Sequence, residues 1–368
     1  MGVIPSVARN LRCIARSGRL HAALGLSMVV GATGLRAQVP EIAFDANPDY
    51  LKVPTTLPWG EVAGVAIDAK RHLFVYVRTG AQNTLHAQVA AQLYEFGPDG
   101  AFIREIGKGL YSFAFAHTVR IGPDGNLWIS DEGTNMVTKL TPAGKPLMAL
   151  GRRPEAVEAP AELPPGQLPR PQWGTFNRPT DVAWDKDGNI FVADGYNNSR
   201  VVKIDKNGRW VKTWGDRGTG ESQFNILHSI ANDNAGNIYV ADRTNRRIQV
   251  FDPDGKFLRQ FTIDVPFTKP VNVMVGAMPS ANSNPLSVSG APWAICITPG
   301  PNQVLFSADA VPGRIYKLSL DGKVLGVFGE AGKEPKQFGW IHEIACPSAH
   351  ELFVAELLNW RVNHLTLK

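Results

Sequence analysis

The chain has 368 residues, of which 44% are apolar and 19% are charged, so it is long enough to bury a large core. Five of its 38 basic residues and none of its 33 acidic residues lie within residues 1–37, so the rest of the chain is balanced in charge. This balance excludes the broad basic surface that nucleic-acid binding needs, and we expect no nucleic-acid partner.

Residues 1–37 have the pattern of an export signal. Arginines are followed by an apolar run over residues 22–34 and then by Leu35-Arg36-Ala37. We predict cleavage after Ala37 and a secreted or periplasmic protein. The apolar run is too short to span a bilayer comfortably, so no membrane association is expected once the leader is removed. The first six residues also fit an N-myristoylation pattern, an alternative that the export run disfavours.

Residues 38–368 are predicted to be a single domain built from six copies of one repeat. Each copy has an apolar strand, a turn rich in Asp, Gly and Asn, a second strand ending in Ala-Asp or a variant, and further strands after it. The third copy shows all four strands, at 180–184, 190–194, 200–204 and 210–214. The six copies cover residues 61–106, 116–150, 180–214, 226–261, 291–328 and 340–367.

These segments alternate β-branched or aromatic residues with polar ones, which is typical of strands. Four antiparallel strands repeated six times predict an all-β, six-bladed β-propeller. The sixth copy shows only three strands, so a strand from the start of the domain, at 42–44 or 51–53, is expected to complete it and close the ring. Residues 154–172 and 262–290 break the repeat and are predicted to be surface loops between blades.

Two cysteines, Cys296 and Cys346, remain after the leader is removed. Both lie in apolar stretches that are predicted to be strands. They could pair in an oxidising compartment. Their apolar neighbours favour two buried free thiols instead.

Three histidines occupy one position of the repeat. His117, His228 and His342 each stand at the start of the first strand, in the second, fourth and sixth copies. The small residues Ala63, Thr180 and Ala294 are expected at this position in the other three copies. Alternate blades of a six-fold ring face one axis, so the three imidazoles are expected to meet there. Three neutral imidazoles with an open fourth position match a catalytic zinc site. The alternative is that each histidine is a separate structural residue.

Other polar residues follow the second strands, which end at the same rim of the ring. Arg78 and Arg243 occupy equivalent positions in the first and fourth copies, and Tyr196 follows the second strand of the third. The two guanidinium groups suit recognition of a carboxylate, or they bond blade carbonyls. Tyr196 is either a packed aromatic or an acid–base group whose pKa nearby positive charge would lower.

The sequence resembles the peptidyl-α-hydroxyglycine α-amidating lyase family, whose members are six-bladed propellers of the NHL-repeat class. The resemblance covers residues 62–367, and its most specific part is Asp194-Gly195-Tyr196 together with the three histidines. The other matching stretches are 62–68, Arg78, 117–119, 179–183, 197–200, 228–229, 241–243 and 342–344.

The resemblance implies a lyase that cleaves the N–C bond of a carbinolamide, releasing an amide and glyoxylate. The substrate would be a small molecule or peptide with a carboxylate. Zinc would stabilise the developing alkoxide, and Tyr196 would be the acid–base group. The residues implied to hold zinc are His117, His228 and His342, and those implied to shape the pocket and bind the carboxylate are Arg78 and Arg243.

The resemblance also implies a structural calcium ion. Its ligands would be the backbone carbonyls of Val65 and Val119 and the side chain of Glu343, where the family has an aspartate. Trp340 stands where the family has a methionine, two residues before the third histidine, and is expected to contact the substrate.

Two other functions remain open, because propellers support many activities. One is a non-catalytic propeller that binds a peptide or protein. The other is a metal-dependent hydrolase or lactonase on the same scaffold.

Overall fold

The structure, a computed structural model, describes residues 39–79, 90–153, 171–269 and 289–368. The predicted export signal and most of the two predicted loops lie outside these ranges. Within them the chain forms strands and no helix, so no described helix is long and apolar enough to cross a membrane.

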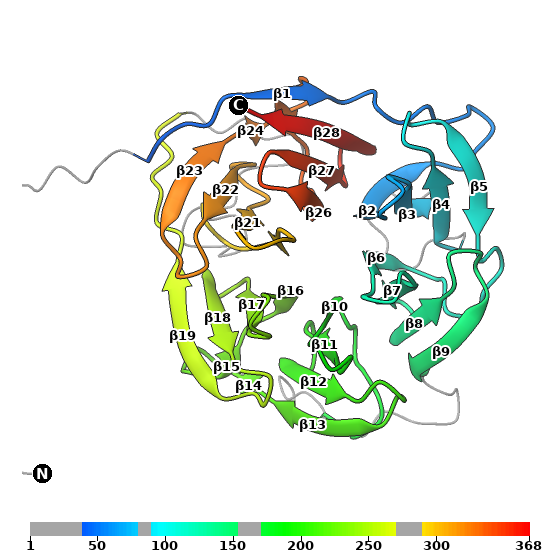
Figure 1. Cartoon of the computed structure of the whole chain (residues 1–368), viewed down its shortest axis with the longest axis vertical. Helices are drawn as coiled ribbons and strands as arrows, with labels where there is room; N and C mark the ends of the chain where they lie inside the picture. The colour runs from blue at the N-terminus through cyan, green and yellow to red at the C-terminus, as the bar shows by residue number, and fades with distance from the viewer. Residues whose placement is uncertain (1–38, 80–89, 154–170, 270–288) are drawn as a thin grey trace, which may run out of the picture. The chain divides into compact units, whose positions relative to one another are not determined.

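Six four-stranded antiparallel sheets surround a common axis, which confirms the six-bladed propeller (Figure 1). In the first five blades the strands follow chain order from the axis outward. The first three blades contain β2 (Gly60–Ile67), β3 (Leu73–Thr79), β4 (Gln92–Phe96) and β5 (Phe102–Ile106); β6 (Ala116–Ile121), β7 (Leu127–Asp131), β8 (Met136–Leu140) and β9 (Pro146–Gly151); and β10 (Asp181–Trp184), β11 (Ile190–Asp194), β12 (Arg200–Ile204) and β13 (Trp210–Trp214).

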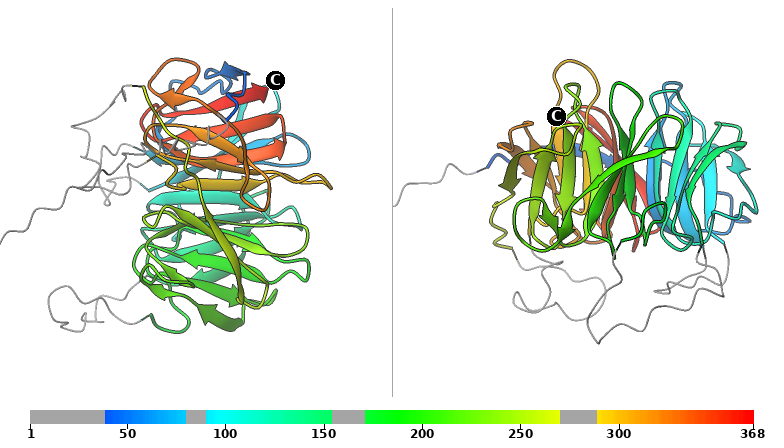
Figure 2. Two further views of the ribbon diagram at one scale, coloured as in Figure 1. Left: turned by 90° about the vertical axis from the view of Figure 1, so that its left-hand side faces the viewer. Right: turned by 90° about the horizontal axis from the view of Figure 1, so that it is seen from below.

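The remaining blades continue in the same way, and Figure 2 shows the six sheets from the side. They contain β16 (Leu227–Asn232), β17 (Ile238–Asp242), β18 (Arg247–Phe251) and β19 (Phe257–Thr262); β20 (Ala294–Ile297), β21 (Leu305–Ala308), β22 (Ile315–Leu318) and β23 (Val324–Phe328); and β26 (Ile341–Ser348), β27 (Glu351–Glu356) and β28 (Arg361–Leu367). Two short parallel pairs lie between blades, namely β14 (Asp216–Arg217) with β15 (Gln223–Phe224) and β24 (Glu330–Ala331) with β25 (Gln337–Phe338).

A strand from the start of the domain completes the sixth blade, as expected. That strand is β1 (Phe44–Asn47), which pairs antiparallel with β28, so it lies just after the predicted 42–44 and before 51–53. On either side of it, Glu41 bridges to the outer strand of the fifth blade and Lys52 bridges to the start of β5 in the first. One short segment therefore ties three blades together and covers sheet edges that would otherwise be open.

The core lies between the blades. In one such cluster, Tyr239 and Val250 of the fourth blade pack against Ile295 and Leu305 of the fifth, and all four are fully buried. Each blade is covered only by its neighbours, which is why the ring is needed for stability.

The strand pairing places inner-strand residues of the six blades at matching levels. The first level contains Ala63, His117, Thr180, His228, Trp293 and His342. The second level contains Gly64, Thr118, Asp181, Ser229, Ala294 and Glu343. The third level, two residues further along, contains Ala66, Arg120, Ala183, Ala231, Cys296 and Ala345.

The prediction of two free thiols is wrong, because Cys296 and Cys346 form a disulfide. They lie on β20 and β26, the inner strands of adjacent blades, and their Cα atoms are 6.1 Å apart, within the usual range for a disulfide. The apolar neighbours predicted burial correctly for Cys346, whereas Cys296 is only partly buried. They carried no information on the distance between two strands that are 50 residues apart in sequence.

We predict that the Cys296→Ala/Cys346→Ala double variant loses about 2–4 kcal/mol of unfolding free energy, because the disulfide closes a long loop in the unfolded chain. Chemical denaturation with and without a reductant measures this loss. Reductant should destabilise the native protein and leave the double variant unchanged. Equal unfolding free energies for the native protein and the double variant, both without reductant, would contradict the prediction.

Candidate active site

The three predicted histidines meet at the first level of the ring. Their ring centroids lie 4.6–5.0 Å apart, and their nitrogen ligand atoms lie within 4.8 Å of one another. His117, His228 and His342 are all buried. In each case the register of the inner strand shifts at the histidine, so the histidine is the extra residue of a β-bulge. A bulge re-aims a side chain that regular pairing would direct elsewhere.

Backbone carbonyls fix two of the imidazoles. The Nδ1 of His228 donates to the carbonyl of Trp293 at 2.6 Å, and the Nδ1 of His342 donates to that of Ala63 at 2.7 Å. Because a carbonyl only accepts, the proton is on Nδ1 and the lone pair on Nε2. This is the state in which imidazole binds a metal through Nε2.

All three imidazoles are held neutral. Burial lowers the pKa of each one well below its usual value. Positive charge from Arg243 adds to the effect at all three, and that from Arg78 adds to it at His117 and His342. For His117 the backbone of Thr180 opposes the shift, although neither ring nitrogen has a partner in hydrogen-bonding geometry. Neutral imidazoles are the form that metal ligation requires.

The residues present therefore fit a metal ion. Both ring nitrogens of His117 and the Nε2 of His228 are buried without a hydrogen-bond partner. Such groups cost about 1–3 kcal/mol each when left unsatisfied. One ion shared by three close imidazoles would satisfy the nitrogens that face it, so the cluster is a candidate metal centre.

The second strands deliver the other site residues to the same rim. One of them, Arg78, lies near the end of β3, opposite the start of its inner strand. The others directly follow the second strands of their blades and are Glu132, Arg243 and Leu357. In the third blade Gly195 takes this place, because a Cβ there would lie 1.8 Å from the carbonyl oxygen of Leu227. The next residue, Tyr196, therefore lines the pocket instead.

Buried carboxylates hold the loops that carry these residues. Asp131 accepts hydrogen bonds from the backbone N–H groups of Ala114 and Phe115, both at 2.8 Å. Asp194 accepts from the N–H of Asn177 at 2.8 Å, and Asp242 accepts from that of Asn225 at 2.7 Å. The acid that ends each second strand thus fixes the segment leading into the inner strand.

A cavity of about 250 Å³ opens above the histidines. Its lining joins a charged side, a phenol and an apolar side. The residues are Glu61, Arg78, Phe115, Glu132, Arg178, Tyr196, Arg243, Trp293, Trp340, His342, Leu357 and Leu358. The structure thus brings the predicted Arg78, Tyr196, Arg243 and Trp340 to the three histidines.

Tyr196 lies against two imidazoles and two guanidinium groups. Its ring is 5.6 Å from that of His117 and 5.9 Å from that of His228. Arg178 and Arg243 lie 4.5 and 5.4 Å from its ring centroid. Burial and the charge of Glu132 raise the pKa of Tyr196, against the lowering effect of Arg243 and Arg78. Among the protein residues alone, burial thus outweighs the guanidinium charges, and the lowering expected beside a metal ion stays a prediction.

The two predicted arginines differ in how many of their N–H groups already have hydrogen-bond partners. Arg78 donates from Nε to the carbonyl of Ala116 at 2.7 Å and pairs with Glu61 at 3.3 Å. Arg243 packs over Trp293 at 3.9 Å, and its Nε and Nη1 are buried without a hydrogen-bond partner. Arg243 is therefore the guanidinium that is open to an anion.

Three residues of the site were not predicted from the sequence, namely Glu132, Arg178 and Trp293. Glu132 pairs with Arg178, and its other oxygen is 3.8 Å from His117 Nε2, too far for a hydrogen bond. Trp293 occupies the first level in the fifth blade, where Ala294 was expected. The inner strand of that blade has no register shift, so its first-level residue lies one position earlier in the sequence than the repeat pattern indicates.

Arg178 and Trp340 share a repeat position that could have been found. Each stands two residues before a first-level residue, and each has a left-handed backbone, with φ of 62°. Ile226 holds the same position and conformation in the fourth blade. The carbonyls of these residues accept the backbone N–H of Tyr196, Leu357 and Arg243, respectively. Such strain for a bulky residue is characteristic of functional sites.

The residues expected to bind calcium make different contacts. Glu343 Oε2 accepts the backbone N–H of Val65 at 2.9 Å and that of Val119 at 3.3 Å. Its other oxygen is 3.1 Å from Nε of Arg120 but has no partner in hydrogen-bonding geometry. A calcium ion needs oxygen ligands around it, and calcium at Val65, Val119 and Glu343 stays a prediction.

Comparison with known proteins finds NHL repeats and relatives named as amidating enzymes. The NHL repeat family matches residues 176–204 and 224–251. The chain is 32% identical over 252 residues to a peptidyl-glycine alpha-amidating monooxygenase of Mus musculus, covering 60% of this chain and 24% of that protein. It is 30% identical over 210 residues to a probable peptidyl-alpha-hydroxyglycine alpha-amidating lyase of Caenorhabditis elegans, covering 52% and 55%. The chain thus spans between about a quarter and about half of these relatives.

A solved structure agrees with the fold. The selenomethionine-substituted virginiamycin B lyase of Staphylococcus aureus superposes with a TM-score of 0.54 at 13% identity, covering 89% of this chain and all of that one. At this identity the likeness shows the fold alone. The protein is thus a six-bladed propeller with NHL repeats. In sequence it is similar to amidating lyases, as the resemblance indicated.

We predict that the purified protein carries a divalent metal ion and that His117→Ala weakens its affinity by more than about 100-fold, since even residues behind metal ligands contribute 10–100-fold. Elemental analysis after dialysis measures the content. His72→Ala is the matched control, because His72 pairs with Glu95 away from the cluster. Equal metal in both variants would contradict a metal centre at the histidines.

Proposed function

We propose that the protein is a zinc-dependent lyase that cleaves the N–C bond of a peptidyl-α-hydroxyglycine-like carbinolamide. The observation that carries this proposal is the cluster of three buried imidazoles, with a phenol against two of them and an open guanidinium in the cavity that His342 lines. The similarity to amidating lyases supports the reaction class. Zinc bound by His117, His228 and His342 would supply Lewis acidity to an oxygen of the substrate.

The proposed reaction needs no oxidant and consumes no water. The hydroxyl proton of the carbinolamide leaves, its C–O bond becomes the carbonyl of glyoxylate, and the C–N bond breaks. The amide nitrogen takes the electron pair and gains a proton. Tyr196 would give its phenol proton to the amide nitrogen and regain a proton from the carbinol hydroxyl, since it lies against the imidazoles and its raised pKa keeps it protonated before the reaction.

The remaining residues hold the substrate. Arg243 binds the carboxylate, because two of its N–H groups lack partners, while Arg78 shapes the pocket from its contacts with Glu61 and Phe115. Trp340 and Trp293 meet edge to face, with centroids 5.1 Å apart, and form an apolar wall for the acyl side of the substrate. The proposed partner is therefore a small molecule or peptide with a carboxylate.

We place the protein outside the cytoplasm, as secreted or periplasmic. The pattern of residues 1–37 and the disulfide between Cys296 and Cys346 support this location, because disulfides persist in oxidising compartments.

The test is glyoxylate release from an N-acyl-α-hydroxyglycine by the zinc-loaded protein. Tyr196→Phe should lower kcat by about 10²–10⁴-fold, the usual contribution of a general acid–base group, and leave the zinc content unchanged. Glyoxylate is measured by a coupled colour reaction and zinc by elemental analysis.

The outcomes separate the competing functions. A zinc-loaded protein that releases no glyoxylate but hydrolyses an ester or lactone contradicts the lyase and favours the hydrolase. A protein that binds a peptide at the same cavity, without metal or turnover, favours a binding propeller.

A second prediction concerns the carboxylate. Arg243→Lys keeps the charge but loses the planar fork, so kcat/KM should fall by about 10–100-fold, mostly through KM. Steady-state kinetics on the acid substrate and on its carboxamide analogue measures this. The native protein and the variant should act alike on the carboxamide, and an equal loss on both substrates would exclude Arg243 as the carboxylate ligand.

A further inference from the structure

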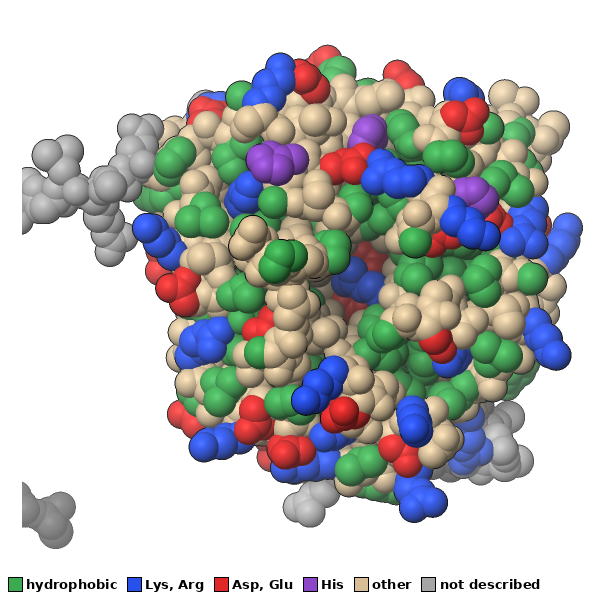
Figure 3. Space-filling view, in the orientation of Figure 1, with side chains coloured by type: hydrophobic (Ala, Val, Ile, Leu, Met, Phe, Trp, Pro, Cys, Tyr) green, Lys and Arg blue, Asp and Glu red, His purple; other side chains and the backbone are tan. Residues whose placement is uncertain are grey.

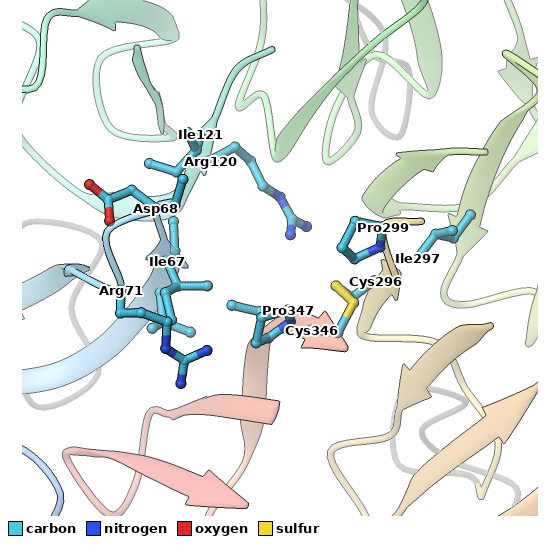
Figure 4. Close-up of a pocket in the computed structure, with 14 residues that line it drawn as sticks. Ile67, Asp68, Arg71, Arg120, Ile121, Cys296, Ile297, Pro299, Cys346 and Pro347 are labelled. Atoms are coloured by element: carbon cyan, nitrogen blue, oxygen red, sulfur yellow. A yellow bond between two sulfur atoms is a disulfide. The ribbon is translucent and has the colours of Figure 1, made fainter. Parts of the chain in front are cut away.

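Two openings on the ring differ in the polar groups that they offer to a ligand. Figure 3 shows a hollow at the centre of one face, with charged side chains inside it. Figure 4 shows an opening into which the side chain of Arg120 reaches and which Arg71 also lines. Arg120 already pairs with Asp181, and Arg71 already pairs with Glu351. The cavity above the histidines differs, because polar groups in its lining lack a partner.

Glu132 is the carboxylate of this cavity that has a bare oxygen. Its Oε1 accepts from Nε of Arg178 at 3.1 Å and also from Nη2 of the same residue. Its Oε2 is buried and has no hydrogen-bond partner. The other carboxylate in the lining, Glu61, pairs with Arg78. Because a buried acceptor without a donor is costly, Oε2 marks a position where a donor of a ligand is expected.

The Glu132–Arg178 pair is fixed at both ends. The backbone N–H of Glu132 donates to the carbonyl of Phe115 at 3.1 Å. The backbone N–H of Arg178 donates to Oδ1 of Asn135 at 2.8 Å. Only 2% of the Glu132 side chain is exposed, so the carboxylate has little freedom to turn toward water. Oε2 therefore keeps one direction.

This direction is toward the imidazoles. Oε2 of Glu132 lies 3.8 Å from Nε2 of His117. Tyr196 is also close, since Arg178 lies 4.5 Å from the centroid of its ring and the charge of Glu132 acts on its pKa. On the same phenol ring lies Arg243, at 5.4 Å, with two N–H groups that lack partners. Tyr196 thus neighbours both a bare acceptor and bare donors.

These bare groups define the chemistry of a ligand. Arg243 suits a carboxylate, and Glu132 suits an N–H or O–H group. A carboxylate and an amide N–H on the two sides of one carbon occur together in an N-acylated α-amino acid. In the proposed reaction the carbinol hydroxyl lies at the imidazoles and Tyr196, which leaves the amide N–H for Glu132. The arginines and tryptophans of the lining cannot take this N–H, because their side chains only donate.

We propose that Glu132 is a specificity-determining residue that accepts the amide N–H of the substrate. The site then takes secondary carbinolamides and rejects those whose nitrogen carries a second carbon substituent. This inference rests on the proposed lyase function and narrows its substrate class. Holding the N–H at Glu132 also sets which face of the amide nitrogen meets the phenol of Tyr196.

Binding of two analogues that cannot react tests the proposal on the zinc-loaded full chain. N-benzoylglycine has the amide N–H, and N-benzoyl-N-methylglycine does not. By calorimetry, the native protein should bind the first about 10–100-fold more tightly, the usual effect of a hydrogen bond to a charged group. Glu132→Gln has the same size, but its carbonyl oxygen faces Arg178 and its amide nitrogen replaces the bare oxygen. The ratio of the two affinities should therefore fall about 10-fold or more in this variant.

Glu61→Gln is the matched control, because Glu61 lines the same cavity and also pairs with an arginine. It should leave the ratio of the two affinities unchanged, even if it alters both of them. The methyl group takes the same space in all three proteins, so its bulk cancels in the comparison. An unchanged ratio in Glu132→Gln, or an equal fall in both variants, would overturn the proposal.

Zinc content separates this role from metal binding. Glu132→Gln should retain the zinc of the native protein, and loss of zinc would show that Glu132 holds the metal and would overturn the proposal. If Glu132→Gln does not fold, the native protein provides the test with benzoyloxyacetate, in which an ester oxygen replaces the N–H at nearly the same size. Benzoyloxyacetate should bind about 10-fold or more weakly than N-benzoylglycine, and equal affinities would overturn the proposal.

The binding assay needs no turnover, so it can fail or succeed apart from the lyase assay. Glyoxylate release by a native protein that binds both benzoyl analogues equally would exclude only the role of Glu132. A native protein that prefers N-benzoylglycine through Glu132 but releases no glyoxylate would support the N–H acceptor and contradict the lyase.

Discussion

The β-bulge at the start of the inner strand is the feature on which the site depends. Side chains alternate between the faces of a regular strand, so one extra residue changes which of them faces the axis. Bulges occur in the first, second, fourth and sixth blades, at Ala63, His117, His228 and His342. Three of these bulges supply imidazoles, and the bulge at Ala63 supplies the carbonyl that orients His342. The candidate metal ligands and one of the groups that orient them thus arise from the same backbone irregularity.

Residues of the second level, one position further along the inner strands, form hydrogen bonds next to the bulges. Thr118, directly after His117, donates to the carbonyl of Thr180 at 3.0 Å, and Ser229, directly after His228, donates to Asp181. Glu343 directly follows His342 and accepts the backbone N–H groups of Val65 and Val119. A metal centre works only when its ligands are held in place by the groups behind them. In this ring those groups are the hydrogen-bonded residues of the second level.

The repeat pattern predicted the blades and the histidine level because both follow from period and position. It could not show which copies contain a bulge, so Ala294 was assigned to the position that Trp293 occupies. It also could not show that Cys296 and Cys346 are neighbours, since closing the ring brings together inner strands that lie far apart in sequence. Arg178 escaped notice for another reason. Its repeat position, shared with Trp340, is visible in the sequence, but the left-handed backbone that aims its side chain is not.

The mouth of the channel is chemically divided, and the division gives a substrate one orientation. Blades one to four contribute charged or phenolic groups, including Arg78, Tyr196 and Arg243, whereas blades five and six contribute Trp293, Trp340 and leucines. A carboxylate would accept N–H groups of Arg243 and compensate its charge, which a neutral acyl carbonyl would not, and a carboxylate would lose its hydration against the two indoles without gaining a partner. The proposed substrate, with a carboxylate on one side of a carbinol carbon and an acyl amide on the other, would therefore bind in a single direction, with the carbinol between them at the imidazoles.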